Sequence, residues 1–147
     1  MGSGFALAAK KNNKNYRTFV VLGDGECYEG SVWEAAMFAA HQKLENLVVI
    51  VDRNELCILG KTEELLSLGN LEAKWRSFGW ETRPVNGHSF EELLDAFSLV
   101  GRTRGKPLSI IANTVKGKGI SFMEGRAEWH NKMPDDEQWR LHWKNLA

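Results

Sequence analysis

The sequence predicts an α/β fold in which helices cover both faces of a doubly wound, mostly parallel sheet. Two observations carry this prediction. Short apolar segments alternate with helical segments along the chain, as they do when crossover helices join parallel strands. Two of the apolar segments, TFVVLG at 18–23 and LVVIVD at 47–52, are almost uniformly hydrophobic. Such continuous runs are typical of strands in a parallel sheet that is covered on both sides.

The first half of the chain is predicted to contain two helices, two strands and a loop. Residues 4–15 form the last turns of a helix followed by an asparagine-rich turn, and 16–23 form the first strand. Alanine-rich residues from about Ser31 to Leu44 carry apolar side chains at helical spacing and predict the connecting helix. The second strand is expected at 46–52, and an irregular loop at 55–69 follows it.

The second half continues the alternation. Its predicted elements are a short helix at 70–80, a strand or extended segment at 81–87, a helix at 88–105, a strand at 107–115, a glycine-bearing loop at 116–134 and an amphipathic helix at 135–147. The helix at 88–105 opens with a capping-box pattern, Ser89 followed by Glu92.

Length and charge limit the possible functions. The 147 residues suit one domain with one core, and 19 basic residues balance 19 acidic ones. Without a basic excess or a polybasic run, we expect no nucleic acid and no membrane as partner. The apolar runs are too short to span a bilayer. Two cysteines and no secretory pattern indicate free thiols in a reducing cytoplasm.

Polar residues end two of the predicted strands. Asp24, between two glycines, follows the first strand, and Asn54 follows the second. The thirty residues between them match one strand-helix-strand crossover, so neighbouring strands would bring both side chains to one crevice. Carboxylate and amide oxygens suit Mg²⁺ or Ca²⁺ better than zinc or copper. The glycines and the helix beginning at Gly30 would admit a phosphate.

A plain structural interpretation competes with this metal-phosphate site. Gly-Asp-Gly is also an ordinary turn, and a polar residue at a second strand end is weak evidence alone. The joint occurrence of the two features, one crossover apart, is the stronger argument. The residues by themselves leave both interpretations open.

The same residues resemble a known family. The Gly-Asp-Gly followed after thirty residues by an asparagine resembles the thiamine diphosphate motif of thiamine-dependent enzymes. Residues 16–54 resemble transketolase, especially the split type whose N-terminal half is a separate subunit, and residues 112–138 resemble the end of that subunit. The resemblance covers nearly the whole chain, so we expect 1–147 to be a single, partial diphosphate-binding domain with an incomplete thiamine diphosphate-binding fold.

The resemblance implies a role for eight residues. Asp24, the Asn54 side-chain amide and the Leu56 carbonyl would bind Mg²⁺, with Ca²⁺ as an alternative, and two diphosphate oxygens and a water would complete the octahedron. The other roles are Gly25 and the Glu26 backbone against the diphosphate, Ile58 beside the thiazolium ring, His130 reaching the diphosphate and the ketose, and Glu29 at the dimer interface near the cofactor.

Structural roles remain open for several of these positions. Ile58 could belong to the core, Glu29 could be a helix first-turn acid, and His130 could be a packed surface histidine. Lys116 could face phosphate, but a solvated loop is the favoured interpretation for it and for Lys118. Two further histidines, His41 and His88, and the six tryptophans are expected to be structural.

Two parts of a complete transketolase are not found in this sequence. The glutamate that activates the cofactor belongs to a pyrimidine-binding domain, which the resemblance therefore assigns to a partner, the C-terminal transketolase subunit. Residues 4–10 resemble the tail of a family helix, so we expect the upstream strand, helices and histidines to be absent and an apolar edge to be uncovered.

The predicted function is therefore the cofactor-binding part of a transketolase, which transfers a two-carbon ketol unit between sugar phosphates. We expect a homodimer or heterotetramer with the pyrimidine-binding subunit, and no transketolase activity in the isolated chain. The alternatives are another thiamine diphosphate-dependent enzyme subunit and a non-catalytic interaction module that keeps the fold.

Overall fold

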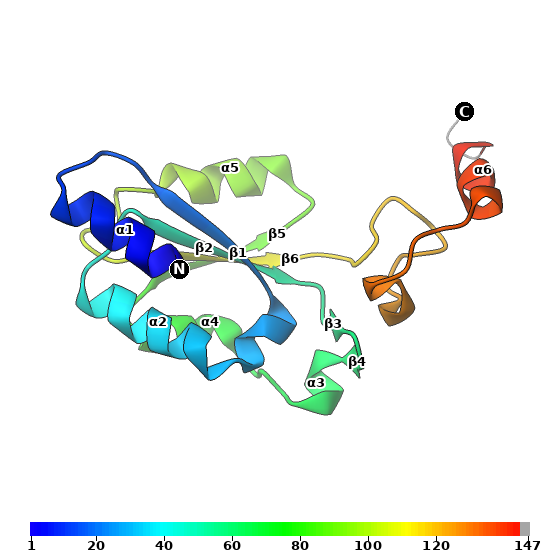
Figure 1. Cartoon of the computed structure of the whole chain (residues 1–147), viewed down its shortest axis with the longest axis horizontal. Helices are drawn as coiled ribbons and strands as arrows, with labels where there is room; N and C mark the ends of the chain where they lie inside the picture. The colour runs from blue at the N-terminus through cyan, green and yellow to red at the C-terminus, as the bar shows by residue number, and fades with distance from the viewer. Residues whose placement is uncertain (145–147) are drawn as a thin grey trace.

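The computed structural model describes residues 1–144 and contains a parallel sheet whose strands run in the order β1-β2-β6-β5. The four strands, seen in Figure 1, are β1 (Thr18–Gly23), β2 (Leu47–Arg53), β5 (Glu81–Asn86) and β6 (Leu108–Asn113). This confirms the predicted α/β class. The last strand in sequence lies inside the sheet, while β5 takes an edge, where the missing N–H of Pro84 is tolerated.

Helices cover both faces of the sheet and define two separate cores (Figure 1). On one face lie α1 (Gly2–Lys11), α2 (Gly30–His41) and α4 (Leu71–Ser77), and on the other lies α5 (Phe90–Ser98). Successive residues of β2 point to opposite faces, so Val48 joins the second core while Val49 and Val51 join the first. This explains why the strand is apolar throughout.

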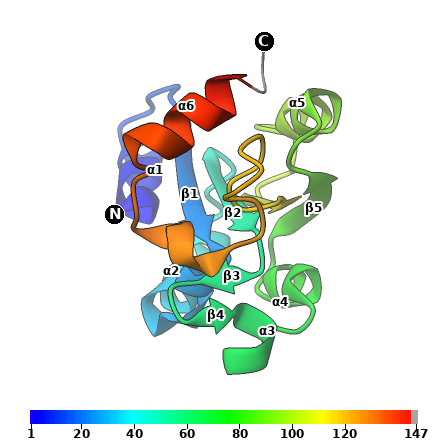
Figure 2. The ribbon, with the colours of Figure 1, turned by 90° about the vertical axis from the view of Figure 1, so that its right-hand side faces the viewer.

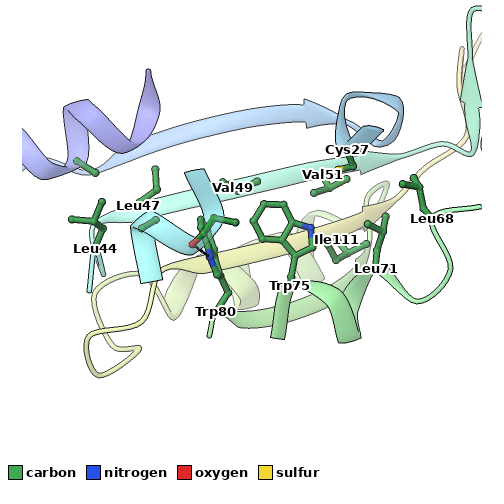
Figure 3. Close-up of a cluster of buried hydrophobic side chains, with 13 residues drawn as sticks. Cys27, Leu44, Leu47, Val49, Val51, Leu68, Leu71, Trp75, Trp80 and Ile111 are labelled. Carbon is green, nitrogen blue, oxygen red and sulfur yellow. Dashed lines mark hydrogen bonds between the residues drawn. The ribbon is translucent and has the colours of Figure 1, made fainter. Parts of the chain in front are cut away.

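The first core is built around aromatic side chains of α4 and the residues that follow it. Trp75 and Trp80 are buried, with ring centroids 4.8 Å apart and planes at 72°. The Trp80 indole N–H donates to the carbonyl of Ala36 in α2 at 3.0 Å, so one hydrogen bond joins the link between α4 and β5 to α2 within the apolar cluster of Figure 3. Trp33 stacks on Phe78 beside them. The predicted packing role of these tryptophans is confirmed.

The second face is covered only in part, because α5 lies over β5, β6 and β2. On β1, Val21 is 69% exposed and Phe19 is 52% exposed, although Phe19 makes an edge contact with Phe97 of α5. Apolar side chains of α5 that face away from the core, such as Leu94, are also exposed. An uncovered apolar surface therefore lies at this edge of the described structure.

Two predicted helix boundaries and one predicted loop were wrong. The helix after β1 ends at His41 instead of Leu44, and the helix expected over 88–105 ends at Ser98. Beyond Ser98 the chain turns, with Arg104 and two glycines at positive φ, which a helix cannot accommodate. The loop at 55–69 is more regular than predicted, since it contains a small hairpin and a helical turn. These elements are β3 (Leu56–Cys57), β4 (Gly60–Lys61) and α3 (Thr62–Leu65).

The predicted capping box forms in part. The Ser89 hydroxyl accepts the N–H of Glu92 at 3.3 Å and so caps α5. The Glu92 carboxylate accepts the N–H of Asn86, at 2.6 Å, in place of the Ser89 N–H that a capping box would use.

The C-terminal segment extends beyond the carboxyl ends of the strands (Figures 1 and 2). It contains a 3-10 turn, η2 (Ala127–His130), and the helix α6 (Asp136–Lys144). Residues 145–147 of the predicted helix and the side chain of Trp143 lie outside the described part of the chain. Among the described helices, none has the length and apolar character needed to cross a membrane.

Candidate functional site at the carboxyl ends of the strands

The two predicted strand ends meet at one cavity. Because β1 pairs with β2 in parallel register, with Gly23 opposite Asp52, the segments that follow both strands lie side by side. The cavity there has a volume of about 750 Å³. All eight residues predicted to form a site line it: Asp24, Gly25, Glu26, Glu29, Asn54, Leu56, Ile58 and His130. The structure therefore brings together side chains that are up to 106 positions apart in the sequence, from Asp24 to His130.

Asp24 is the buried acid of this cavity. It opens the 3-10 turn η1 (Asp24–Tyr28) directly after β1 and is 1% exposed. Its Oδ1 accepts the N–H of Gly25 at 2.9 Å, and its Oδ2 accepts the N–H of Glu55 at 2.7 Å. Burial raises the pKa of the Asp24 carboxyl, the two backbone hydrogen bonds oppose this shift, and the nearby Asp52 adds to it.

Asn54 faces the same cavity from the end of β2. Its amide oxygen accepts the N–H of Leu56 at 3.1 Å, and its amide nitrogen donates to Oδ2 of Asp52 at 3.3 Å. The other carboxylate oxygen of Asp52 accepts the hydroxyl of Thr114, which follows β6. Glu55, between Asn54 and Leu56, has φ +61, and its N–H donates to Asp24.

The Asp24 and Asp52 carboxylates of the cavity have no ion-pair partner among the described residues. Among the described residues, no Lys or Arg nitrogen lies within 4.0 Å of the Asp24 or Asp52 carboxylates. Arg53 pairs instead with Glu55 at 3.8 Å and Glu63 at 3.9 Å. A buried carboxylate without an ion-pair partner is a costly arrangement, which a bound cation would relieve.

The donor set selects the kind of cation. The described residues contain no group of three or more His, Cys, Asp or Glu side chains arranged to hold a metal ion. The cavity instead offers a carboxylate, a side-chain amide and backbone carbonyls, which are hard oxygen donors. These donors fit Mg²⁺ or Ca²⁺ and do not fit a zinc centre.

Gly25 lies against the hairpin β3–β4, where a larger residue would be crowded. A Cβ added to Gly25 would lie 3.3 Å from the Cβ of Cys57, so a side chain there would press on the hairpin β3–β4. The Glu26 carboxylate accepts the N–H of Gly23 at 2.7 Å and is held against the backbone. Helix α2 begins at Gly30, as predicted, with its N-terminal end close to this turn.

The outer wall of the cavity is apolar. Ile58 is 63% exposed and Leu59 is 82% exposed, and both line the cavity from the hairpin segment. The alternative that Ile58 belongs to the core is therefore wrong. Exposed aliphatic side chains next to a polar floor form a surface that can receive a ligand with a charged end and a less polar end.

The C-terminal segment closes one side of the cavity with His130 and Lys116. His130 is exposed and lies in η2, while its neighbour Trp129 packs on Phe122 and donates to the Phe122 carbonyl at 3.0 Å. Lys116 is half-buried in its loop and lines the cavity. Lys118 does point outward, where it pairs with Glu124 at 3.6 Å.

The sequence analysis assigned no role to Asp52, which lines the cavity and binds Asn54 and Thr114. A single polar residue in an apolar strand does not indicate which side chains it will contact. His88 has the expected structural role, since its Nε2 accepts the N–H of Val115 at 2.8 Å. His41 is the last residue of α2, away from the cavity.

Comparisons with known proteins agree with this geometry. The protein-family model described as the transketolase thiamine diphosphate-binding domain matches residues 5–144. A curated relative from Phocaeicola vulgatus, one of the subunits of an apulose-4-phosphate transketolase, is 46% identical over 139 residues, which are 95% of this chain and 50% of the relative. A 6-deoxy-6-sulfo-D-fructose transketolase subunit of Clostridium sp. strain MSTE9 is 42% identical over 93% of this chain and 50% of its own length.

Solved structures agree as well. The crystal structure of transketolase from Campylobacter jejuni superposes with a TM-score of 0.91 at 30% identity, covering 98% of this chain and 24% of that one. The chain spans about half the length of the curated subunits that it matches. From its sequence, its fold and the family model, the chain belongs to the transketolase family, as a thiamine diphosphate-binding domain.

Proposed function

We propose that the cavity binds the diphosphate end of thiamine diphosphate through a divalent cation, Mg²⁺ or alternatively Ca²⁺. The observation that carries this proposal is the buried Asp24 carboxylate, which shares a cavity with the Asn54 amide and has no cationic side chain as its partner among the described residues. The family supplies the identity of the cofactor. The cation would be the missing counter-charge.

Each predicted residue has a role in this proposal. Asp24, the Asn54 amide oxygen and the Leu56 carbonyl would hold the cation. The backbone at Gly25 and Glu26 would face the diphosphate.

The remaining residues act farther from the cation. Ile58 would contact the thiazolium ring, and His130 would reach the diphosphate and the ketose. Lys116, which lines the cavity, would add positive charge beside the phosphates. Glu29 would contribute to the interface near the cofactor.

The proposed activity is transfer of a two-carbon ketol unit between sugar phosphates. Thiamine diphosphate supplies the carbanion chemistry of such a transfer when it is bound. The chain's own contribution is placement. The 3-10 turn and the end of β2 fix the diphosphate end, Ile58 and Leu59 shield one side from water, and His130 offers a hydrogen-bonding group to the substrate.

A second polypeptide is part of the proposal. The curated relatives named above are called subunits, and this chain matches half of their length. We propose that the partner is a pyrimidine-binding C-terminal transketolase subunit, assembled as a homodimer or a heterotetramer. The isolated chain would then show no ketol transfer. Measurable transfer between sugar phosphates by the pure polypeptide would contradict this.

The test is a titration of thiamine diphosphate, followed by tryptophan fluorescence with Mg²⁺ or with EDTA, on the chain alone and with a pyrimidine-domain partner. Binding should require the cation and should be lost in Asp24→Ala. Asp95→Ala is the matched control, because Asp95 is exposed on α5, away from the cavity. Equal binding by Asp24→Ala and wild type would refute the site.

Two alternatives are separate outcomes of the same experiment. If the complex binds the cofactor but acts on another keto substrate, the chain belongs to a different thiamine reaction. If no cofactor binds even with the partner present, the chain is an interaction module.

A further inference from the structure

Asp52 has no role in the proposed cation site, yet it lies at the centre of that site's hydrogen bonds. It is half-buried in β2, paired with Gly23 on one side and Ala112 on the other. One of its oxygens accepts the Asn54 amide N–H at 3.3 Å, and the other accepts the Thr114 hydroxyl. The segments that follow two different strands, β2 and β6, thus meet at one carboxylate.

We propose that Asp52 and Thr114 are positioning residues that fix the orientation of the Asn54 side-chain amide before any cation binds. The benefit of this arrangement rests on the proposed function, in which the Asn54 amide oxygen is a ligand. The orientation itself is a property of the cation-free chain, so it can be tested separately.

The hydrogen bonds around Asn54 distinguish its two amide orientations. In the observed orientation the oxygen accepts from Leu56 N–H, and the nitrogen donates to Asp52. Rotating the amide by half a turn would place its nitrogen against the Leu56 N–H and its oxygen against the Asp52 carboxylate. Both contacts would then be repulsive, donor against donor and acceptor against acceptor. Asp52 therefore selects the orientation in which the amide nitrogen is turned away from the proposed ligand position.

Thr114 holds the Asp52 carboxylate in turn, and its own position is fixed by the sheet. Its backbone N–H donates to the Arg53 carbonyl at 3.1 Å, which continues the pairing of β2 with β6. A Cβ added to Gly87 would lie only 2.4 Å from the Thr114 methyl carbon, so the glycine leaves the space that this side chain occupies. Backbone pairing and packing thus aim the hydroxyl at Asp52.

The test is ¹⁵N relaxation of the Asn54 side-chain amide in the whole chain, in EDTA, with the resonance assigned by its loss in Asn54→Asp. The amide should be as ordered as the neighbouring backbone in wild type. It should become mobile in Thr114→Val, which keeps the methyl against Gly87 but removes the hydroxyl. Thr114→Ser, which keeps the hydroxyl, is the matched control and should retain the order. Asp52→Ala should also release the amide, provided that its backbone spectrum remains folded.

The result that overturns the proposal is a mobile Asn54 amide in wild type, or one that stays equally ordered in folded Thr114→Val. A second measurement links the orientation to binding: Mg²⁺ affinity in the presence of thiamine diphosphate should fall about tenfold in Thr114→Val and be restored in Thr114→Ser. Unchanged affinity in a variant with a mobile amide would also overturn it. A wild-type complex that binds no cation would refute the proposed function, while the relaxation measurement would still decide the orientation.

Discussion

Raising the pH should destabilise the folded chain through one buried thiol. Cys27 lies in η1, three residues after Asp24, and is 2% exposed within the first core (Figure 3). Burial raises the pKa of the Cys27 thiol from 9.0 to about 12, and the nearby Asp24 and Glu26 carboxylates add to the shift. The folded chain therefore keeps the thiol protonated at a pH where the unfolded chain has released its proton.

The sign and size of the effect follow from these two pKa values. Above pH 9 the unfolded state binds fewer protons than the folded state, so the free energy of unfolding falls as the pH rises toward 12. With the values of 9.0 and about 12, the loss attributable to Cys27 is about 1.4 kcal/mol at pH 10, relative to pH 7. Below pH 8 the contribution of Cys27 should not vary with pH.

The assay is urea unfolding of wild type and Cys27→Ala, followed by tryptophan fluorescence between pH 7 and pH 10. Taking the difference between the two proteins removes the contribution of shared groups such as Tyr28. Cys57→Ala provides a second check that Cys27 is buried. Cys27 is the only thiol left in this variant, and it should react with a thiol reagent at pH 8 only after unfolding. A wild-type minus variant difference that stays constant, or that grows with pH, would refute this reasoning.

Three further substitutions test other parts of the fold. Trp80→Phe should lower the free energy of unfolding by about 2 kcal/mol, measured by urea titration, because it removes a buried hydrogen bond and ring volume; no change would contradict the description of the first core. Gly117→Ala should speed proteolysis of the loop that carries Lys116, because φ is +73 and the new Cβ would lie 2.8 Å from the backbone of Met123. Gly119→Ala, at φ +94 but with no atom within 4 Å, should have the smaller effect, and equal rates would exclude the steric explanation. Val21→Thr should leave the free energy of unfolding within about 0.5 kcal/mol but reduce self-association, measured by sedimentation, since this side chain is 69% exposed; unchanged association would show that the uncovered face is not adhesive.

Local sequence was enough to predict most elements, and it placed Asp24 and Asn54 at the ends of neighbouring strands. Apolar runs and helical spacing identify buried strands and amphipathic helices because each pattern repeats within a few residues. The ends of two helices were misplaced. The helix expected to reach residue 105 ends at Ser98, where glycine and turn geometry overcome helical propensity.

The contacts that complete the candidate site depend on the tertiary structure. The strand order places β6 beside β2, and this brings the Thr114 hydroxyl to Asp52 although the two residues are 62 positions apart. The same long-range folding brings Lys116 and His130 to the cavity and leaves Ile58 exposed there.

The sequence by itself thus determined the fold class, the family and the two residues most central to the candidate site. Only the tertiary structure decided which strand lies inside the sheet, which side chains support Asn54 and which face of β1 stays uncovered. The physical reason is that strand pairing and side-chain hydrogen bonds join residues whose separation along the chain leaves no periodic pattern to detect.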